Sequence, residues 1–200
     1  SLKIPKLSQF SVKNSILSFM MQKRIHNIEE FCMNPIKTQK KVFDNLISKG
    51  KNTVFGKEHH FNSITKYSHF KNNIPIRTYE EFSVYIKRAR NGDQNVLWPG
   101  KIKWFSKSSG TTNAKSKFIP VTKESLKECH FKGGKDMLSL YGNNFPFSDM
   151  YNGKGLMLGG TIKESEKGDY KDGDLSAILL DEFPFWVNYH RVPDIETALM

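Results

Sequence analysis

Apolar residues recur at helical spacing along the first fifty residues of the chain. In residues 14–33 they stand mostly three or four positions apart, as in an amphipathic helix: Ile16, Leu17, Met20, Met21, Ile25, Ile28 and Phe31. Asn34 and Pro35 suit the N-cap and first turn of a second helix, which we expect to end at Gly50. Apolar stripes on consecutive helices usually pack in a core, so the pattern predicts a helical hairpin at the N-terminus.

The pattern then changes from helices to strands. Thr78 and Glu81 have the spacing of a capping box, which opens a helix that fades at Asn91 and Gly92. Residues 102–105 and 117–121 are short runs rich in β-branched and aromatic residues, which favour strands. We therefore expect an α/β fold in which residues 1–95 are mainly helical. Residues 96–200 are expected to form a mixed β-sheet with flanking helices.

The segment between the two predicted strands suits neither a helix nor a strand. Gly110 allows a sharp turn and a close approach to a ligand. The other residues of the segment supply hydroxyls and positive charge: Ser106, Ser108, Ser109, Thr111, Thr112 and Ser116, with Lys107, Lys115 and Lys117. Successive amides in such a turn bind anions, and lysine acts as a point charge on phosphate oxygens. We therefore interpret the segment as a phosphate loop, although segments of this composition are more often solvated turns.

The loop differs from the common nucleotide-binding loop. The chain has no Gly-x-x-x-x-Gly-Lys-Ser/Thr motif, and a strand rather than a helix is expected after the loop. These two differences exclude a kinase-like or GTPase-like interpretation.

The loop and several other segments resemble one family of enzymes. Ser108-Ser109-Gly110-Thr111-Thr112, followed by Lys117 and Pro120, resembles the phosphate loop of the adenylate-forming superfamily, which includes acyl-CoA synthetases and luciferases. Within it, the chain resembles the auxin-responsive acid-amido synthetase family, the Gretchen Hagen type. Further similar segments follow in family order: Thr53-Val54-Phe55-Gly56, Phe70, Ile74-Pro75-Ile76, Tyr79-Glu80, Val96-Leu97-Trp98-Pro99-Gly100 and Gly173-Asp174-Leu175-Ser176. One departure is Asn113, where many members carry glycine, but asparagine tolerates the left-handed conformation.

The resemblance implies a function and a set of site residues. It implies an ATP-dependent ligase that activates a small carboxylic acid as its acyl adenylate and transfers the acyl group to an amine such as an amino acid. ATP and Mg²⁺ are the implied cofactors. The implied phosphate-binding residues are Ser108, Ser109, Gly110, Thr111 and Thr112, with Lys117 as the catalytic counter-charge because it matches the family position better than Lys115. Family members are much longer, so we expect the chain to be an N-terminal fragment of the large adenylate-forming domain and inactive alone.

Two segments after the loop carry further predictions. Thr122 suits the N-cap of a helix that runs to about Tyr141, and in relatives this helix helps to shape the acyl-acid site. The mid-helix pair Gly133 and Gly134 suggests close approach by another element or by substrate. The wholly apolar run at residues 155–160 predicts a buried strand that ends in glycines, where a ligand could approach.

Composition narrows the alternatives. A net charge of +11 would suit a nucleic-acid-binding domain, but the lysines are spread along the chain between acidic residues, and no nucleic-acid motif occurs. A lysine-rich solvated surface is the favoured interpretation, and nucleic-acid binding the weaker alternative. A second alternative is that the protein is a relative of the family that keeps the fold but has lost catalysis, and only binds acids or partners.

The sequence does not predict disulfides, a metal site made by the protein alone, or a membrane span. Two cysteines, Cys32 and Cys129, are too few for a disulfide framework and fit a reducing cytoplasm. The histidines and the aspartates have neither zinc nor calcium spacing, so no metal site made by the protein alone is expected: His59, His60 and His69, with Asp169, Asp172 and Asp174. No apolar run approaches the length of a membrane-spanning helix.

Overall fold

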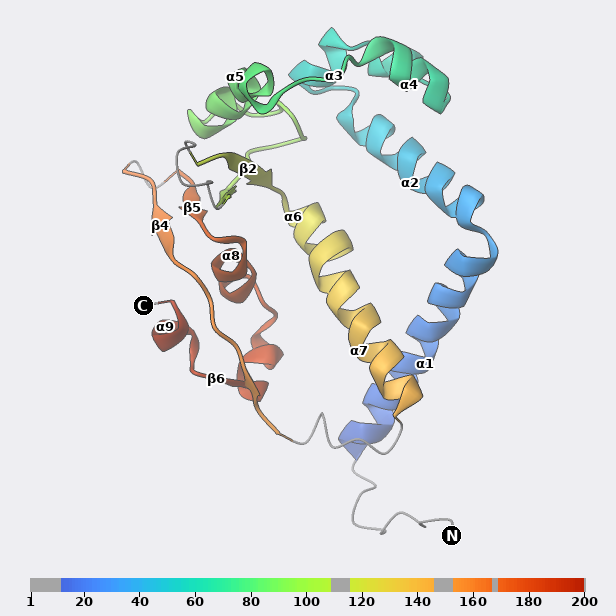
Figure 1. Ribbon diagram of the computed structural model, residues 1–200, viewed down its shortest axis with the longest axis vertical. Helices are drawn as coiled ribbons and strands as arrows, with labels where there is room; N and C mark the ends of the chain where they lie inside the picture. Colours follow the sequence, from blue (N-terminus) through green and yellow to red (C-terminus); the bar gives the residue numbers. More distant parts are fainter. Residues whose placement is uncertain (1–11, 109–115, 146–152, 167–168, 200) are drawn as a thin grey trace.

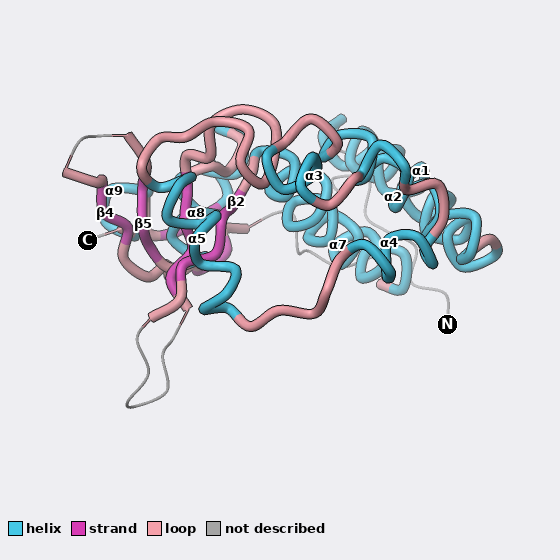
Figure 2. The backbone as a smooth tube through the Cα atoms, turned by 90° about the horizontal axis from the view of Figure 1, so that it is seen from above, coloured by secondary structure: helices cyan, strands magenta, loops and turns pink. Residues whose placement is uncertain are grey.

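The computed structural model describes residues 12–108, 116–145, 153–166 and 169–199. Helices precede the sheet along the chain: α1 (Val12–Met33), α2 (Pro35–Gly50), α3 (Val54–Glu58), a 3-10 turn (Phe61–Ser63), α4 (Tyr67–Asn73) and α5 (Tyr79–Arg90). The strands follow: β1 (Trp104–Lys107), β2 (Phe118–Val121), β3 (Gly155–Leu156), β4 (Ile162–Glu164), β5 (Lys171–Gly173) and β6 (Arg191–Val192). Seen from above, α1 to α4 gather on one side and the strands on the other (Figure 2). A domain division at residue 95 stays a prediction.

The first two helices have the predicted bounds, but they do not pair as a hairpin. At the turn the Asn34 amide donates to the Glu30 carbonyl at 3.0 Å, and its side chain makes no cap hydrogen bond. From there α2 leads away, and α1 lies instead along α7 (Lys132–Asn144) (Figure 1). The Arg24 Nη2 donates to Asp136 Oδ2 at 2.6 Å, and this hydrogen bond raises the pKa of the arginine. A partner more than a hundred residues away therefore replaces the expected neighbour.

The helix after the loop begins at the predicted position, because Thr122 is its N-cap and forms a reciprocal capping box with Ser125. It begins as α6 (Lys123–Ser125), widens into a π-helical segment (Leu126–Phe131) and continues as α7. Gly133 and Gly134 do not mark a close approach by another element, since a Cβ built on either one meets nothing within 4 Å. The space beside them is open.

The four-stranded sheet is mixed, as expected for this fold class. Its strand order is β2-β1-β5-β4; β1 pairs antiparallel with β2 and parallel with β5, and β5 pairs antiparallel with β4. Successive side chains on a strand point to opposite faces. Trp104 therefore packs on one face with Ile178 of α8 (Leu175–Asp181), and Phe105 on the other with Tyr85 of α5.

The apolar run at residues 155–160 is not a buried strand. Only Gly155 and Leu156 are extended, and they pair in parallel with β6 in a separate two-stranded sheet. The side chains of Leu156 and Leu158 are 71% and 76% exposed. An apolar run predicts burial only where a second layer covers it, and the described residues place none over these two leucines.

The C-terminal residues form short elements beside the sheet. Residues Phe185–His190 make a 3-10 segment before β6, and α9 spans Ile195–Ala198. Asp194 caps α9 by accepting from the Thr197 amide at 2.9 Å, which lowers the pKa of its carboxyl. In Figure 1 these elements lie next to α8, below the sheet.

Candidate functional site

The stem of the predicted phosphate loop is a regular antiparallel ladder. The last residue of β1, Lys107, lies opposite Phe118, the first residue of β2. One residue further out, the Ser108 amide donates to the Lys117 carbonyl at 2.9 Å, and the Lys117 amide donates to Ser108 Oγ at 3.3 Å. These bonds hold the two ends of the loop together at the sheet edge. The loop residues Ser109, Gly110, Thr111 and Thr112 lie outside the described residues, as do Asn113 and Lys115.

The stem lies at the carboxyl end of a parallel strand pair. In β1 and β5, Ser106 lies opposite Gly173, so both strands end at the same edge, next to Ser108 and Asp174. Ligands in open α/β sheets bind outside the carboxyl ends of the strands. The stem of the loop is therefore placed where this fold class binds its ligands.

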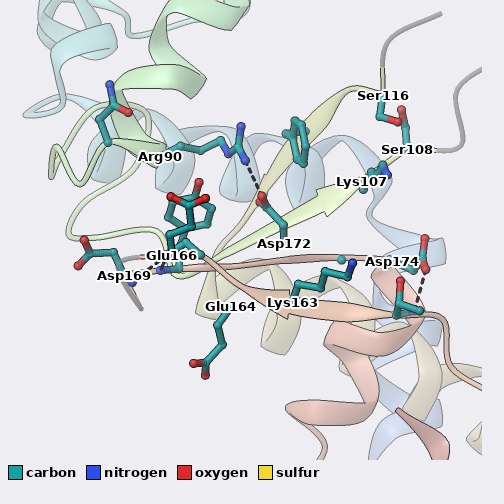
Figure 3. Close-up of a pocket in the computed structure, with 16 residues that line it drawn as sticks. Arg90, Lys107, Ser108, Ser116, Lys163, Glu164, Glu166, Asp169, Asp172 and Asp174 are labelled. Atoms are coloured by element: carbon teal, nitrogen blue, oxygen red, sulfur yellow. Dashed lines mark hydrogen bonds and ion pairs between the residues drawn. The ribbon is translucent and has the colours of Figure 1, made fainter. Parts of the chain in front are cut away.

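A cleft of about 840 Å³ opens beside this stem. Its lining carries cationic, hydroxyl and acidic side chains (Figure 3): Arg90, Lys107 and Lys163; Ser108, Ser116, Thr161 and Ser165; Glu164, Glu166, Asp169, Asp172 and Asp174. Ser108 and Ser116 lie side by side where the described chain breaks off on either side of the loop. Hydroxyls and ammonium groups at one end of a cleft suit the oxygens of a polyphosphate.

The structure separates the predicted residue Lys117 from the cleft lining. Its side chain is exposed, and its Nζ lies 5.3 Å from the centre of the Tyr79 ring. Lys107, which precedes Ser108, is the lysine of the stem that lines the cleft. Among the described site residues predicted from sequence, Ser108 therefore lies at the cleft and Lys117 at its outer side.

An arginine that the sequence did not single out holds the inner wall of the cleft. Arg90, the last residue of α5, has its guanidinium 3.9 Å from the centre of the Phe118 ring and pairs with Asp172 of β5. The rings of Tyr170 and Phe105 lie 5.1 and 5.9 Å away. A basic residue in the last turn of a helix is ordinary in sequence, so no local signal could have identified this contact.

A clasp of backbone and side-chain hydrogen bonds joins the start of β4 to the end of β5, at the same edge of the sheet as the stem. The Asp174 amide donates to the Thr161 carbonyl at 2.9 Å, and Asp174 Oδ2 accepts from the Thr161 amide at 2.9 Å. The Gly160 amide donates to Ser176 Oγ at 3.1 Å. Gly173 leaves no room for a side chain, because a Cβ there would lie 2.5 Å from the Thr161 carbonyl oxygen. The family-like segment at residues 173–176 is thus explained by this clasp.

The tryptophans and histidines near the site have structural roles. Trp104 is buried beneath the stem in the core with Val121 and Leu126. His59 is buried, stacks on Phe55 and contacts the Phe55 carbonyl through Nδ1 at 2.9 Å, so it closes α3. In the part of the chain that the structure describes, no three histidine, cysteine or acidic side chains form a group that could hold a metal ion. No helix among the described residues could span a membrane.

Comparison with known proteins gives consistent matches. A model of the GH3 family N-terminal domain matches residues 24–195. The indole-3-acetic acid-amido synthetase GH3.5 of Arabidopsis thaliana is 29% identical over 123 residues, which are 61% of this chain and 20% of that protein. The jasmonoyl-L-amino acid synthetase JAR6 of Nicotiana attenuata is 31% identical over 141 residues, which are 70% of this chain and 24% of that protein.

A solved structure supports the fold. The GH3.15 acyl acid amido synthetase is similar with a TM-score of 0.70 at 20% sequence identity, over 98% of this chain and 32% of that chain. At this identity the likeness concerns the fold alone, and it confirms the expected α/β class. The chain spans about a fifth of the length of GH3.5 and about a quarter of that of JAR6.

Proposed function

The chain belongs to the GH3 family, and on that premise we propose that its full-length protein is an ATP-dependent ligase. It activates a carboxylic acid as an acyl adenylate and transfers the acyl group to an amine such as an amino acid. The relatives' names support this choice of substrates, because they are synthetases of amides of indole-3-acetic acid and of jasmonoyl-amino acid conjugates. One structural observation carries the proposal furthest: the loop stem, with the hydroxyls of Ser108 and Ser116 and the ammonium of Lys107, opens directly onto a polar cleft at the carboxyl ends of two parallel strands.

The first half-reaction joins the acid to the nucleotide. A carboxylate oxygen attacks the α-phosphorus of ATP, the bond to the bridging oxygen of pyrophosphate breaks, and pyrophosphate leaves. In the second half-reaction the amine nitrogen attacks the acyl carbon, AMP leaves, and the amine gives up a proton. Charge accumulates on the phosphate oxygens in the first step, so positioning and electrostatic stabilisation are the main demands on the protein.

The residues around the stem fit these demands. Ser108 and Ser116 present hydroxyls at the cleft, and Lys107 presents a positive charge beside them. We assign the cradling of the β- and γ-phosphates to Ser108, Ser109, Gly110, Thr111 and Thr112, and the counter-charge to Lys117. Mg²⁺ would be held by one or two of the acidic residues of the cleft lining and would offset the negative charge of the phosphates.

The two cysteines support a proposal for the cellular compartment of the protein. Cys32 and Cys129 are free and exposed. Exposed free thiols persist in a reducing compartment, so we place the protein in the cytoplasm.

The test is acid-dependent ATP–pyrophosphate exchange by the full-length protein, screened over a panel of small carboxylic acids. We expect exchange with at least one acid and its loss in Lys117→Ala. We also expect no exchange by the 200-residue chain alone, since it spans about a fifth of the length of a relative such as GH3.5. A folded full-length protein that exchanges with no acid of the panel would overturn the proposal.

A further inference from the structure

Tyr79 connects the first turn of α5 to the point where the loop rejoins the sheet. The reciprocal capping box of Thr78 and Glu81 fixes the start of this helix, and Tyr79 is its first residue. The Tyr79 hydroxyl accepts a hydrogen bond from the Phe118 amide at 2.7 Å and lies 3.3 Å from the Phe118 carbonyl oxygen, to which it donates. One phenol thus satisfies both backbone groups of Phe118.

These two bonds supply what a neighbouring strand would. β2 lies at the edge of the four-stranded sheet, so its outer backbone groups have no strand partner there. By bonding to Phe118, the hydroxyl of Tyr79 fixes the first residue of β2, and with it the returning end of the loop. The bond is partly buried, and the ring packs against the core cluster around Phe105. Water therefore competes with it less than with a bond on the open surface.

The ring of the same residue holds Lys117. The ammonium lies 5.3 Å from the ring centre, within the range at which the negative face of an aromatic ring attracts a cation. Such an exposed contact is weak, so phosphate oxygens can take the ammonium from it. The Tyr79 side chain therefore contacts two consecutive residues, Lys117 through its ring and Phe118 through its hydroxyl.

We propose that Tyr79 is a positioning residue for nucleotide binding: its hydroxyl fixes the base of the phosphate loop, and its ring holds Lys117 at the stem until phosphate oxygens take the ammonium. The inference rests on the proposed function, because it presumes that the loop binds ATP. It assigns the two effects to different parts of one side chain. They can therefore be separated by substitution.

The experiment measures the dissociation constant of Mg·ATP for the full-length protein by calorimetry. Tyr79→Phe keeps the ring and removes the hydroxyl, and we expect about fivefold weaker binding, as for the loss of about one net hydrogen bond. Tyr79→Leu removes the ring as well; since the ring contact with Lys117 is given up on binding, we expect Tyr79→Leu to bind about threefold more tightly than Tyr79→Phe. Lys117→Ala is expected to weaken binding roughly tenfold or more. In the Lys117→Ala background, Tyr79→Leu and Tyr79→Phe should become equal, because the ring then has no ammonium to hold.

Tyr85→Phe is the matched control. Tyr85 is on the same helix, but its hydroxyl donates to Glu58 Oε2 at 2.5 Å, away from the loop. The control is expected to bind Mg·ATP as the unsubstituted protein does, although it too loses a tyrosine hydroxyl bond, one that together with burial raises the pKa of Tyr85. A purely structural effect of losing a tyrosine hydroxyl from α5 would appear in both variants.

Each outcome decides between the two ideas. If Lys117→Ala weakens binding but Tyr79→Phe and Tyr79→Leu do not, the positioning role is wrong and the ligase proposal stands. If the difference between Tyr79→Leu and Tyr79→Phe persists without Lys117, the ring does not act through that lysine, and this half of the inference is wrong. If the unsubstituted protein neither binds Mg·ATP nor exchanges pyrophosphate, the proposed function fails, and the inference fails with it. Should Tyr79→Leu not fold, Tyr79→Phe against Tyr85→Phe still tests the hydroxyl.

Discussion

Gly173→Ala tests whether the clasp at the end of β5 depends on the missing side chain. Gly173 lines the cleft and lies opposite Ile162 of β4 in the sheet. A Cβ at this position would lie 2.5 Å from the Thr161 carbonyl oxygen and 2.8 Å from the Ile162 Cα. Both are backbone atoms, so no side-chain rotation can relieve the overlap. The substitution must push β4 away from β5.

The cost follows from the contacts that this shift breaks. Overpacking a close-packed site costs about 1–3 kcal/mol. Moving the Thr161 carbonyl also removes its bond from the Asp174 amide, a loss of about 1 kcal/mol. We therefore expect Gly173→Ala to lower the free energy of unfolding by about 2–4 kcal/mol, a large part of the stability of an ordinary domain.

Urea unfolding of the 200-residue chain measures this loss, with Gly133→Ala as the matched control. The change of residue is the same, but a Cβ at Gly133 of α7 meets nothing within 4 Å. Alanine in a helix interior is favoured over glycine by about 0.8–1 kcal/mol, so the control should gain stability. Opposite signs for two identical substitutions are the expected result. An unchanged urea midpoint for Gly173→Ala would show that the close approach does not exist.

Two further substitutions address side-chain contacts made by residues of β5 and their neighbours. Arg90→Lys should lower the free energy of unfolding in urea by about 1–2 kcal/mol, because an ammonium cannot stack on the Phe118 ring as the guanidinium does at 3.9 Å. If the loss is no larger than for an arginine-to-lysine change at an exposed position, the stacking does not contribute. Asp181→Asn removes the hydrogen bond that raises the pKa of Lys171 above 10.5. Since the folded-state pKa is raised, the pair stabilises the fold below about pH 10.5 and loses this contribution as the pH rises through the raised value. Thermal unfolding from pH 7 to 11 should show a loss of about 0.2–1 kcal/mol that fades at the alkaline end, the small size reflecting solvent screening of a pair with a one-third exposed lysine.

The parts of the fold that the sequence predicted are those with local causes. The capping boxes at Thr78 and Thr122 involve residues three apart, and both helices begin where the boxes indicate. The strands of the loop stem were predicted from β-branched and aromatic residues within four positions, and β1 and β2 lie within two residues of the expected bounds. A signal contained within one turn or one strand survives folding because no distant partner is needed to produce it.

The predictions that failed depended on partners far away in sequence. Whether α1 folds back on α2 or lies along α7 is decided by contacts such as Arg24 with Asp136, and the apolar stripe of α1 suits either arrangement. Likewise, the apolar run at residue 155 fits a strand in a covered sheet or, as found, a two-stranded sheet with Leu156 exposed. Periodicity specifies which face is apolar but not what covers it.

Helix α5 combines local sequence signals with contacts to residues that are distant in sequence. The local capping box and apolar face of α5 identify it in the sequence, but they do not reveal that side chains from its two ends converge on Phe118. Tyr79, at the start, bonds to the backbone of Phe118, and Arg90, at the end, stacks on its ring. Any residue except proline at position 118 would keep the backbone bonds, whereas only an aromatic residue keeps the stacked guanidinium. Phe118 therefore does more than form a strand. Through its backbone, Tyr79 of α5 fixes the end of the loop where it rejoins the sheet. Through its ring it packs against Arg90 of the same helix, which pairs with Asp172 in the wall of the cleft.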